Sequence, residues 1–158
     1  MAEQQVSVTR EIGAPAEQVW AMVSDVTRMG EWSPETEGAA WLGGATSAAP
    51  GVKFRGTNRN GKKKWDTVAK IGDAEPGRVL AFEIAAGPLK VAEWRYAFEA
   101  TPTGCRVTET WTDQRGVVVK TLGKMLTGVG DRAEHNRAGI EQTLERLKSA
   151  AESAPTTT

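Results

Sequence analysis

Residues Trp94–Trp111, "WRYAFEATPTGCRVTETW", contain two runs in which apolar and polar side chains alternate. The residues Thr101–Gly104, "TPTG", separate the two runs and are typical of a turn. Alternation with a period of two is typical of a β-strand with one buried face. Strands joined by so short a turn pair in antiparallel fashion. This stretch therefore predicts a hairpin of an antiparallel sheet.

More strands of the same kind precede this hairpin. Asn60-Gly61 separates two further alternating runs, and Asn-Gly is among the strongest short hairpin signals. Glu75–Arg78 and Gly87-Pro88 are turn sequences as well. With the N-terminal run included, the chain predicts an antiparallel sheet of about six or seven strands. The predicted strands lie near residues 5–12, 38–44, 52–59, 62–71, 79–85, 90–100 and 105–113.

Helical periodicity appears on both sides of the sheet sequence. A first helix is predicted from about Pro15 to Asp25, and a short helical turn over Thr27–Glu31. From Val117 onward, apolar residues recur every three or four positions, which predicts a helix of about thirty residues with an interruption allowed near Gly128–Gly130. Its apolar stripe consists of Val118, Leu122, Met125, Leu126, Val129, Ala133, Ile140, Leu144 and Leu147.

The long C-terminal helix has to bury that stripe, and one face of the sheet is the available partner. The order of elements predicts an α+β fold in one domain over residues 4–150, followed by a disordered tail over 151–158. A twisted sheet curled around one helix cannot fill all the space between them with side chains. We therefore expect a cavity.

Two segments resemble a known superfamily. The order of elements, the segment Ala14–Glu35 "APAEQVWAMVSDVTRMGEWSPE" and the segment Trp94–Trp111 resemble START-like (SRPBCC) proteins, and within them the polyketide cyclase/dehydrase branch. The resemblance extends roughly from Val6 to Lys148. It implies a helix-grip (START/Bet v 1-like) fold, with two short helices after the first strand and a curved sheet around the C-terminal helix, enclosing a hydrophobic ligand cavity. Its members include lipid carriers, hormone receptors and aromatase/cyclases, so it implies architecture more narrowly than function.

Strand parity indicates which side chains face the helix. Aromatic residues dominate this inward set, and polar residues recur among them, as expected of a pocket that orients a partly polar ligand. Each aromatic residue taken alone is more typical of plain core packing, and it is the set as a whole that favours a cavity. The residues predicted to line the cavity from the strands are Phe54, Asn58, Trp65, Thr67, Phe82, Trp94, Tyr96, Glu109 and Trp111.

Glu109 is the most informative polar residue of this set. Its alternate neighbours Val107 and Trp111 predict burial, and a buried carboxylate is costly unless it is paired or protonated. It could orient a ligand hydroxyl or exchange protons, or else form a structural pair with an arginine. No catalytic motif is present, so Glu109 and Tyr96 are the only candidates for a catalytic role.

Three further cavity residues are expected outside the strands. Trp32, in "RMGEWSPE" (Arg28–Glu35), either plugs the core or lies at the mouth of the cavity. Met125 and Val129 of the C-terminal helix complete the predicted lining. Trp32 and the region around Gly128 are expected to gate access to the cavity.

The single histidine and a cluster of basic residues are the remaining features with a possible function. His135 falls off the helical stripe and is expected at the surface. Arg59, Lys62, Lys63 and Lys64 gather at a hairpin tip. They favour a solvated tip, and transient contact with an anionic membrane is the alternative.

Composition excludes several classes of protein. Twenty basic residues balance twenty acidic ones, so no charge excess favours nucleic acid. One cysteine and one histidine provide no metal-ligand spacing, and no cofactor motif occurs. No apolar run is long enough to cross a membrane, and with no secretory leader at the N-terminus a cytoplasmic location is expected.

Three functions stay open at this point. The first is a non-enzymatic carrier of a small hydrophobic ligand such as a lipid, polyketide or isoprenoid-like molecule. The second is a polyketide cyclase or dehydratase that uses Glu109 or Tyr96. The third is a regulatory or interaction module whose cavity is vestigial and filled.

Overall fold

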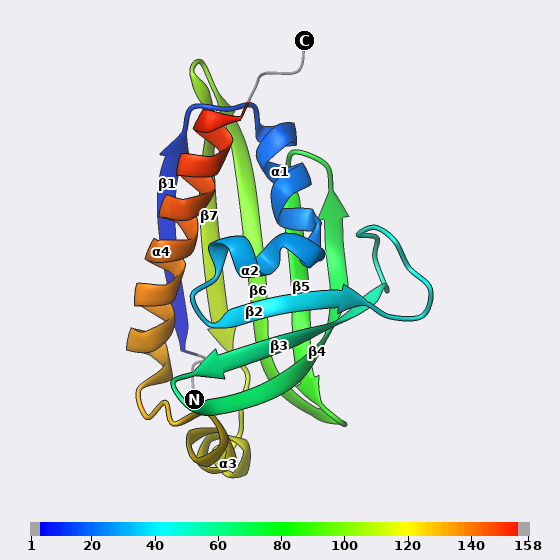
Figure 1. Cartoon of the computed structure of the whole chain (residues 1–158), viewed down its shortest axis with the longest axis vertical. Helices are drawn as coiled ribbons and strands as arrows, with labels where there is room; N and C mark the ends of the chain where they lie inside the picture. Colours follow the sequence, from blue (N-terminus) through cyan, green and yellow to red (C-terminus); the bar gives the residue numbers. More distant parts are fainter. Residues whose placement is uncertain (1–3, 155–158) are drawn as a thin grey trace.

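A computed structural model describes residues 4–154 of the chain (Figure 1). Short connections join most of its helices and strands, and the loop between the second and third strands is longer. The elements are β1 (Gln5–Ile12), α1 (Ala16–Ser24), the 3₁₀ turn η1 (Val26–Arg28), α2 (Met29–Trp32), β2 (Thr36–Trp41), β3 (Lys53–Asn60), β4 (Lys63–Glu75), β5 (Val79–Ala86), β6 (Leu89–Thr101), β7 (Gly104–Asp113), α3 (Val117–Thr127) and α4 (Arg132–Ser153).

The strands form a seven-stranded antiparallel sheet in the order β1-β7-β6-β5-β4-β3-β2. Strands that pair in the sheet also follow one another along the chain, except that β1 pairs with β7. Register shifts between Ile71 and Ala74 and between Ile84 and Ala85 interrupt the ladders in the middle of the sheet. Such irregularities bend strands and increase their twist. The predicted α+β helix-grip fold is therefore confirmed.

Helix α4 lies along β1 and β7 and closes one side of the molecule (Figure 1). Its buried stripe recurs at helical spacing, and Ile140, Leu144 and Leu147 are almost completely inaccessible to solvent. The side chain of Asp131 accepts a hydrogen bond from the Glu134 backbone N–H and begins the helix. Helices α1 and α2 pack over the same face of the sheet at the opposite end from α3 (Figure 1).

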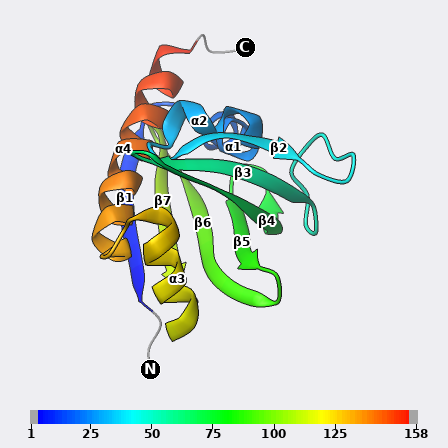
Figure 2. The ribbon, with the colours of Figure 1, turned by 60° about the horizontal axis from the view of Figure 1, so that its bottom comes forward.

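The predicted C-terminal helix is interrupted at Gly128, within the segment Gly128–Gly130 where the sequence allowed a break. Gly128 has φ of 72°, and its backbone N–H donates to the Lys124 carbonyl, so it ends α3 in the left-handed conformation that glycine adopts without strain. After the break, α4 alone follows the sheet, and α3 turns across the end of the molecule (Figure 2).

The expectation that the whole stripe from Val118 onward is buried is therefore wrong for α3. The break at Gly128 moves α3 away from the face that α4 covers, and most of its apolar side chains are exposed. Two side chains of the β3–β4 hairpin hold its C-terminal end. Asn60 Nδ2 donates to the Thr127 carbonyl at 2.7 Å, and Lys63 Nζ donates to the Met125 carbonyl at 2.9 Å.

The last helix also runs further than the sequence indicated. The predicted tail began at residue 151, but α4 ends at Ser153 and Ala151 is buried in the core. Ala151 falls seven residues after Leu144, on the same side of the helix, which explains its burial. Residues 155–158 of the predicted tail lie outside the described residues.

Packing of α4 predicts a stability test. Replacing Leu144 with alanine should lower the free energy of unfolding by about 3 kcal/mol, because a fully buried leucine leaves a cavity when it is truncated. Urea unfolding followed by circular dichroism measures the change. The exposed Glu141 on the same helix is the control, and Glu141→Ala should change stability by less than about 0.5 kcal/mol. Equal effects of the two substitutions would contradict this packing of α4.

Candidate ligand-binding cavity

A cavity of about 490 Å³ lies between the inner face of the sheet and helices α3 and α4. Strands β3 to β7 form its floor, and α4 and the loop after α2 form one wall. Residues of α3 and of the ends of the β3–β4 and β5–β6 hairpins lie around it at the end of the molecule that α3 crosses (Figure 2). Most side chains around it are apolar. Of the residues predicted there, its lining contains Phe54, Asn58, Trp65, Thr67, Phe82, Trp94, Tyr96, Glu109 and Trp111.

Trp32 does not line the cavity. It belongs to the hydrophobic core and is only 3% exposed. Of the two predicted positions, the core and the mouth of the cavity, Trp32 therefore occupies the core. The Arg28 guanidinium lies 4.8 Å from the centre of its ring, on the solvent side. The following residues Ser33 and Pro34 do reach the cavity wall. Trp32, the last residue of α2, therefore packs into the core, and the loop after it borders the cavity.

Met125 and Val129 are also absent from the lining. Met125 is exposed, because its side chain projects from α3 about a quarter-turn away from Leu126, which does line the cavity. Val129 is buried in the linker between α3 and α4 rather than at the cavity. The prediction allowed an interruption near Gly128 but assumed that one apolar stripe faces inward on both sides of it, and the break changes which side of the chain does so.

Glu109 and Tyr96 lie directly opposite each other on β7 and β6, and both are buried. Burial raises the pKa of Glu109 to about 8, although a hydrogen bond from Tyr96 opposes the shift. Burial, together with the nearby Glu109 charge, also raises the pKa of Tyr96 well above its ordinary value. The Oε2 atom of Glu109 has no hydrogen-bond partner among the described residues. At neutral pH the carboxyl group is therefore mostly protonated, and it can donate or accept a hydrogen bond without carrying a charge.

Asn58 and Thr67 line the cavity as predicted, and they are joined by hydrogen bonds. Thr36 Oγ1 donates to Asn58 Oδ1 at 2.9 Å, and Asn58 Nδ2 donates to Thr67 Oγ1 at 3.1 Å. This chain of bonds connects β2, β3 and β4 at the cavity floor. Because the three polar side chains satisfy one another, they can lie beside apolar surface at little cost.

A polar cluster that sequence reasoning missed lies on the opposite wall. Arg132 Nη1 donates to both carboxylate oxygens of Glu35 at 2.9 and 2.8 Å, and His135 Nε2 lies 2.8 Å from Glu35 Oε2. His135 is partly exposed, as expected of a surface residue, but it also pairs with Glu35 and lines the cavity with Asn136, which the sequence did not indicate. The three-residue spacing of Arg132 and His135 placed both on one helix face, but only the fold brings Glu35 to them.

Charged groups in the cavity wall are mutually neutralised. Arg115 donates to both carboxylate oxygens of Asp113, at 2.8 and 2.9 Å. Burial alone would raise the pKa of Asp113, but the hydrogen bonds from Arg115 hold it below its ordinary range. Arg132 is paired with Glu35 in the same way. Within residues 4–154, the lining therefore presents no arginine or lysine without a carboxylate partner.

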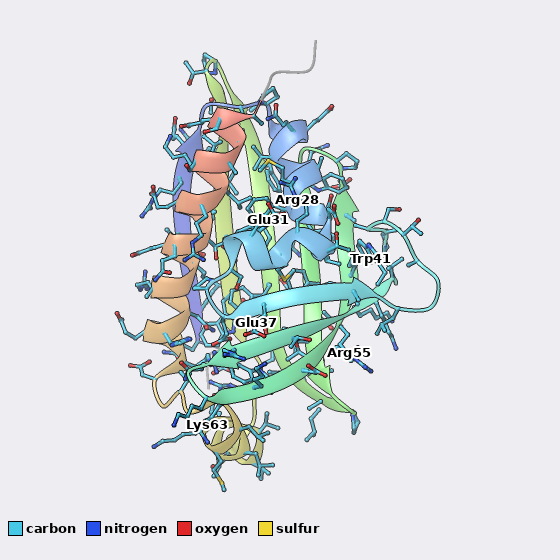
Figure 3. All side chains as sticks on the ribbon, viewed as in Figure 1. Arg28, Glu31, Glu37, Trp41, Arg55 and Lys63 are labelled. Carbon is cyan, nitrogen blue, oxygen red and sulfur yellow. The ribbon has the colours of Figure 1, made fainter. Side chains whose placement is uncertain are left out.

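The basic hairpin tip is partly neutralised as well. Arg59 pairs with Glu37 at 2.6 Å, and Lys64 lies 3.9 Å from the same carboxylate. Lys63 extends from the tip toward α3 (Figure 3). Lys62 makes no ion pair within the described part of the chain.

Neither a metal centre nor a membrane span is found in the part of the chain that the structure describes. No group of three or more His, Cys, Asp or Glu side chains between residues 4 and 154 has the geometry to hold a metal ion. None of the helices described has the length and apolar character needed to cross a bilayer.

The raised pKa of Glu109 predicts a pH-dependent stability. In the unfolded chain Glu109 ionises near its ordinary pKa of 4.5, but in the folded protein only near 8. Between these values the folded state binds the extra proton, so stability falls as pH rises, by a few kcal/mol in total. Glu109→Gln should remove this part of the slope in urea unfolding experiments at several pH values. Glu141→Gln, at an exposed position, should keep the wild-type slope, and parallel profiles for all three proteins would contradict the assignment.

Comparisons with known proteins agree with the observed architecture. The profile of the family described as "Polyketide cyclase / dehydrase and lipid transport" matches residues 3–152. A Polyketide_cyc-like protein from Corynebacterium glutamicum has a TM-score of 0.64 and 28% identity, over 96% of this chain and 93% of that one. A protein from Nitrosomonas europaea has a TM-score of 0.67 and 14% identity, over 92% of each chain.

A two-domain aromatase/cyclase shares the fold too. The di-domain ARO/CYC protein BexL, from the BE-7585A biosynthetic pathway, has a TM-score of 0.71 and 20% identity. The alignment spans 97% of this chain and 51% of BexL, so this chain corresponds to about half of that protein. No curated protein resembles the sequence closely enough to count as a match. Because the family profile spans nearly the whole sequence, the chain belongs to the polyketide cyclase/dehydrase and lipid transport family.

Proposed function

We propose that this protein binds and carries a neutral, largely apolar small molecule in the cavity between the sheet and α4. The observation that carries the proposal is the cavity itself, about 490 Å³ in volume and lined mainly by aromatic and aliphatic side chains. That volume lies within the usual range of small-molecule sites. Removing apolar ligand surface from water there would drive the affinity.

The charges around the cavity support a neutral ligand. Arg115 and Arg132 are each bound to a carboxylate on both of its oxygens, so neither offers an uncompensated charge to a ligand anion. Glu109 adds an uncharged polar group near neutral pH. A hydroxyl or carbonyl group on an otherwise apolar ligand would suit this environment, whereas a fatty-acid carboxylate would lose hydration without gaining a cation.

A cavity-filling substitution tests the proposal. Ile84 lines the cavity, and Ile84→Trp should weaken binding of the neutral fluorescent probe phenylnaphthylamine at least about tenfold, because the indole occupies ligand volume. Glu83, its neighbour on β5, is exposed on the other face of the sheet. Glu83→Trp therefore adds the same group outside the cavity, and probe binding should stay at the wild-type level.

Competition against the bound probe tests the ligand class. A long-chain alcohol should displace the probe at lower concentration than the fatty acid of the same length. Failure of the probe, the alcohol and the acid to bind at all would contradict the carrier function. Equal or better binding of the acid would leave the carrier function standing and contradict the neutral-ligand preference.

An enzymatic function is the second candidate, and one observation favours it. Glu109 has a pKa of about 8 beside the Tyr96 hydroxyl, and such a group can exchange protons with a bound poly-β-ketone near neutral pH. This would be the chemistry of a cyclase or dehydratase. With a soluble β-polyketone as substrate, Glu109→Gln should lower turnover at least about a hundredfold, in line with general acid–base catalysis, and keep phenylnaphthylamine affinity unchanged. A Gln variant as active as wild type would exclude Glu109 from catalysis.

The third interpretation, a module with a filled core, is weakened by the cavity volume.

We propose a cytoplasmic carrier that exchanges its ligand during transient membrane contact, with Arg59, Lys62, Lys63 and Lys64 on the side of the molecule that meets the lipid.

A further inference from the structure

Helix α3 exposes an apolar surface that its sequence predicted to be buried. Among the described residues, the exposed large apolar side chains are those of α3 and one hairpin residue. On α3 the exposed fractions are 80% for Val117, 68% for Val118, 52% for Leu122, 68% for Met125 and 62% for Leu126. A continuous exposed apolar patch of this kind typically marks an interaction site.

This surface borders the opening of the cavity. Leu122 and Leu126 are exposed and also belong to the cavity lining. Leu89, at the start of β6, has the same two properties and is 50% exposed. Figure 2 shows α3 and the β5–β6 hairpin projecting in the same direction from the molecule. Apolar surface therefore continues from the outside of α3 into the cavity.

The charge around α3 is positive, whereas the whole chain is neutral. From Gln114 to Gly130 the sequence contains Arg115, Lys120 and Lys124 and no acidic residue. The adjacent hairpin tip adds Lys62 and Lys63, and Figure 3 shows Lys63 beside α3. The nearby acidic residues include Asp66, Asp113 and Asp131, and Asp113 is paired with Arg115 and lies 3.9 Å from Lys120 Nζ. Basic groups therefore dominate the surroundings of the exposed apolar face.

We propose that α3 is a membrane-docking helix that inserts its apolar face into the surface of an anionic lipid bilayer. The docking face consists of Val118, Leu122, Met125, Leu126 and Leu89, and the exposed Val117 lies at the start of the helix on the side of Lys120 and Lys124. Lys120, Lys124 and Lys62 contact the lipid headgroups, because an anionic membrane surface attracts basic residues that lie close to it. A short helix with apolar residues on one side and lysines on the other is suited to the plane of a membrane interface.

Charge complementarity selects a bilayer over a second copy of this chain. Two copies meeting through α3 would bring Lys120 and Lys124 toward the same residues of the partner copy, at the cost of like-charge repulsion. An anionic bilayer satisfies the lysines and the apolar face together. It also places lipid at the cavity opening, so that an apolar ligand could pass between bilayer and cavity without crossing water.

Substitutions on the outer side of α3 test docking without altering the cavity. Val118 and Met125 belong to the docking face but not to the cavity lining. The double variant Val118→Ser/Met125→Ser should lower partitioning onto phosphatidylglycerol–phosphatidylcholine vesicles at least about tenfold, because two apolar side chains no longer enter the bilayer. Its phenylnaphthylamine affinity should match that of the wild type. Vesicle sedimentation measures the partitioning.

A charge pair on another surface provides the matched control. Lys120→Gln/Lys124→Gln should weaken vesicle binding about tenfold, and high salt should weaken wild-type binding similarly. Lys53 and Lys70 are exposed partners on β3 and β4. Lys53→Gln/Lys70→Gln removes the same charge away from α3 and should leave vesicle binding unchanged.

Three outcomes would overturn the proposal. The first is absence of wild-type binding to the anionic vesicles. The second is vesicle binding that the Val118→Ser/Met125→Ser variant retains. The third is a dimer in sedimentation velocity that this variant dissociates, which would assign the face to a second copy of the chain. Each can occur whether or not a ligand binds, so docking fails or stands separately from the carrier function.

Discussion

The structure depends on the packing of one helix against one face of a curved sheet. Ile140, Leu144 and Leu147 of α4 are buried against this face, and each contributes roughly 1.5–3 kcal/mol by leaving water. A straight helix can follow only part of a curved surface, and α4 stays beside β1 and β7. The space over the remaining strands has to be filled by other elements or stay open.

The space that α4 leaves uncovered over the sheet is filled at one end of the molecule and stays open at the other. At one end, α1 and α2 cover the sheet, and Trp32 of α2 contributes to the buried core. At the other end no helix packs into the space, and the cavity remains. Gly128 ends α3 and turns it across this end, so the same break in the helix leaves the cavity unfilled and exposes the apolar face of α3.

The cavity is lined so that its few polar groups cost little. Arginines in the wall are held by carboxylates, and Asn58 is satisfied by its neighbours on adjacent strands. Glu109 differs from the others, since its Oε2 has no partner in the described part of the chain and burial keeps the group protonated near neutral pH. A buried acid of this kind lowers stability, which is why functional sites are the usual place to find one. The cyclase function would depend on this group, whereas the carrier function depends on the apolar cavity, in which Glu109 adds an uncharged polar group.

Local patterns by themselves determined the strands, their turns and the inward side of each strand. Alternation at Phe54, Tyr96, Glu109 and Trp111 was sufficient to place these side chains toward the helix, because parity within a strand is a local property. Tertiary structure decided the rest. It buries Trp32 in the core, brings Glu35 into hydrogen-bond contact with Arg132 and His135, and leaves the apolar residues of α3 exposed. Periodicity identifies the apolar side of a helix but not what covers it, and that depends on where a glycine break points the helix relative to a distant sheet.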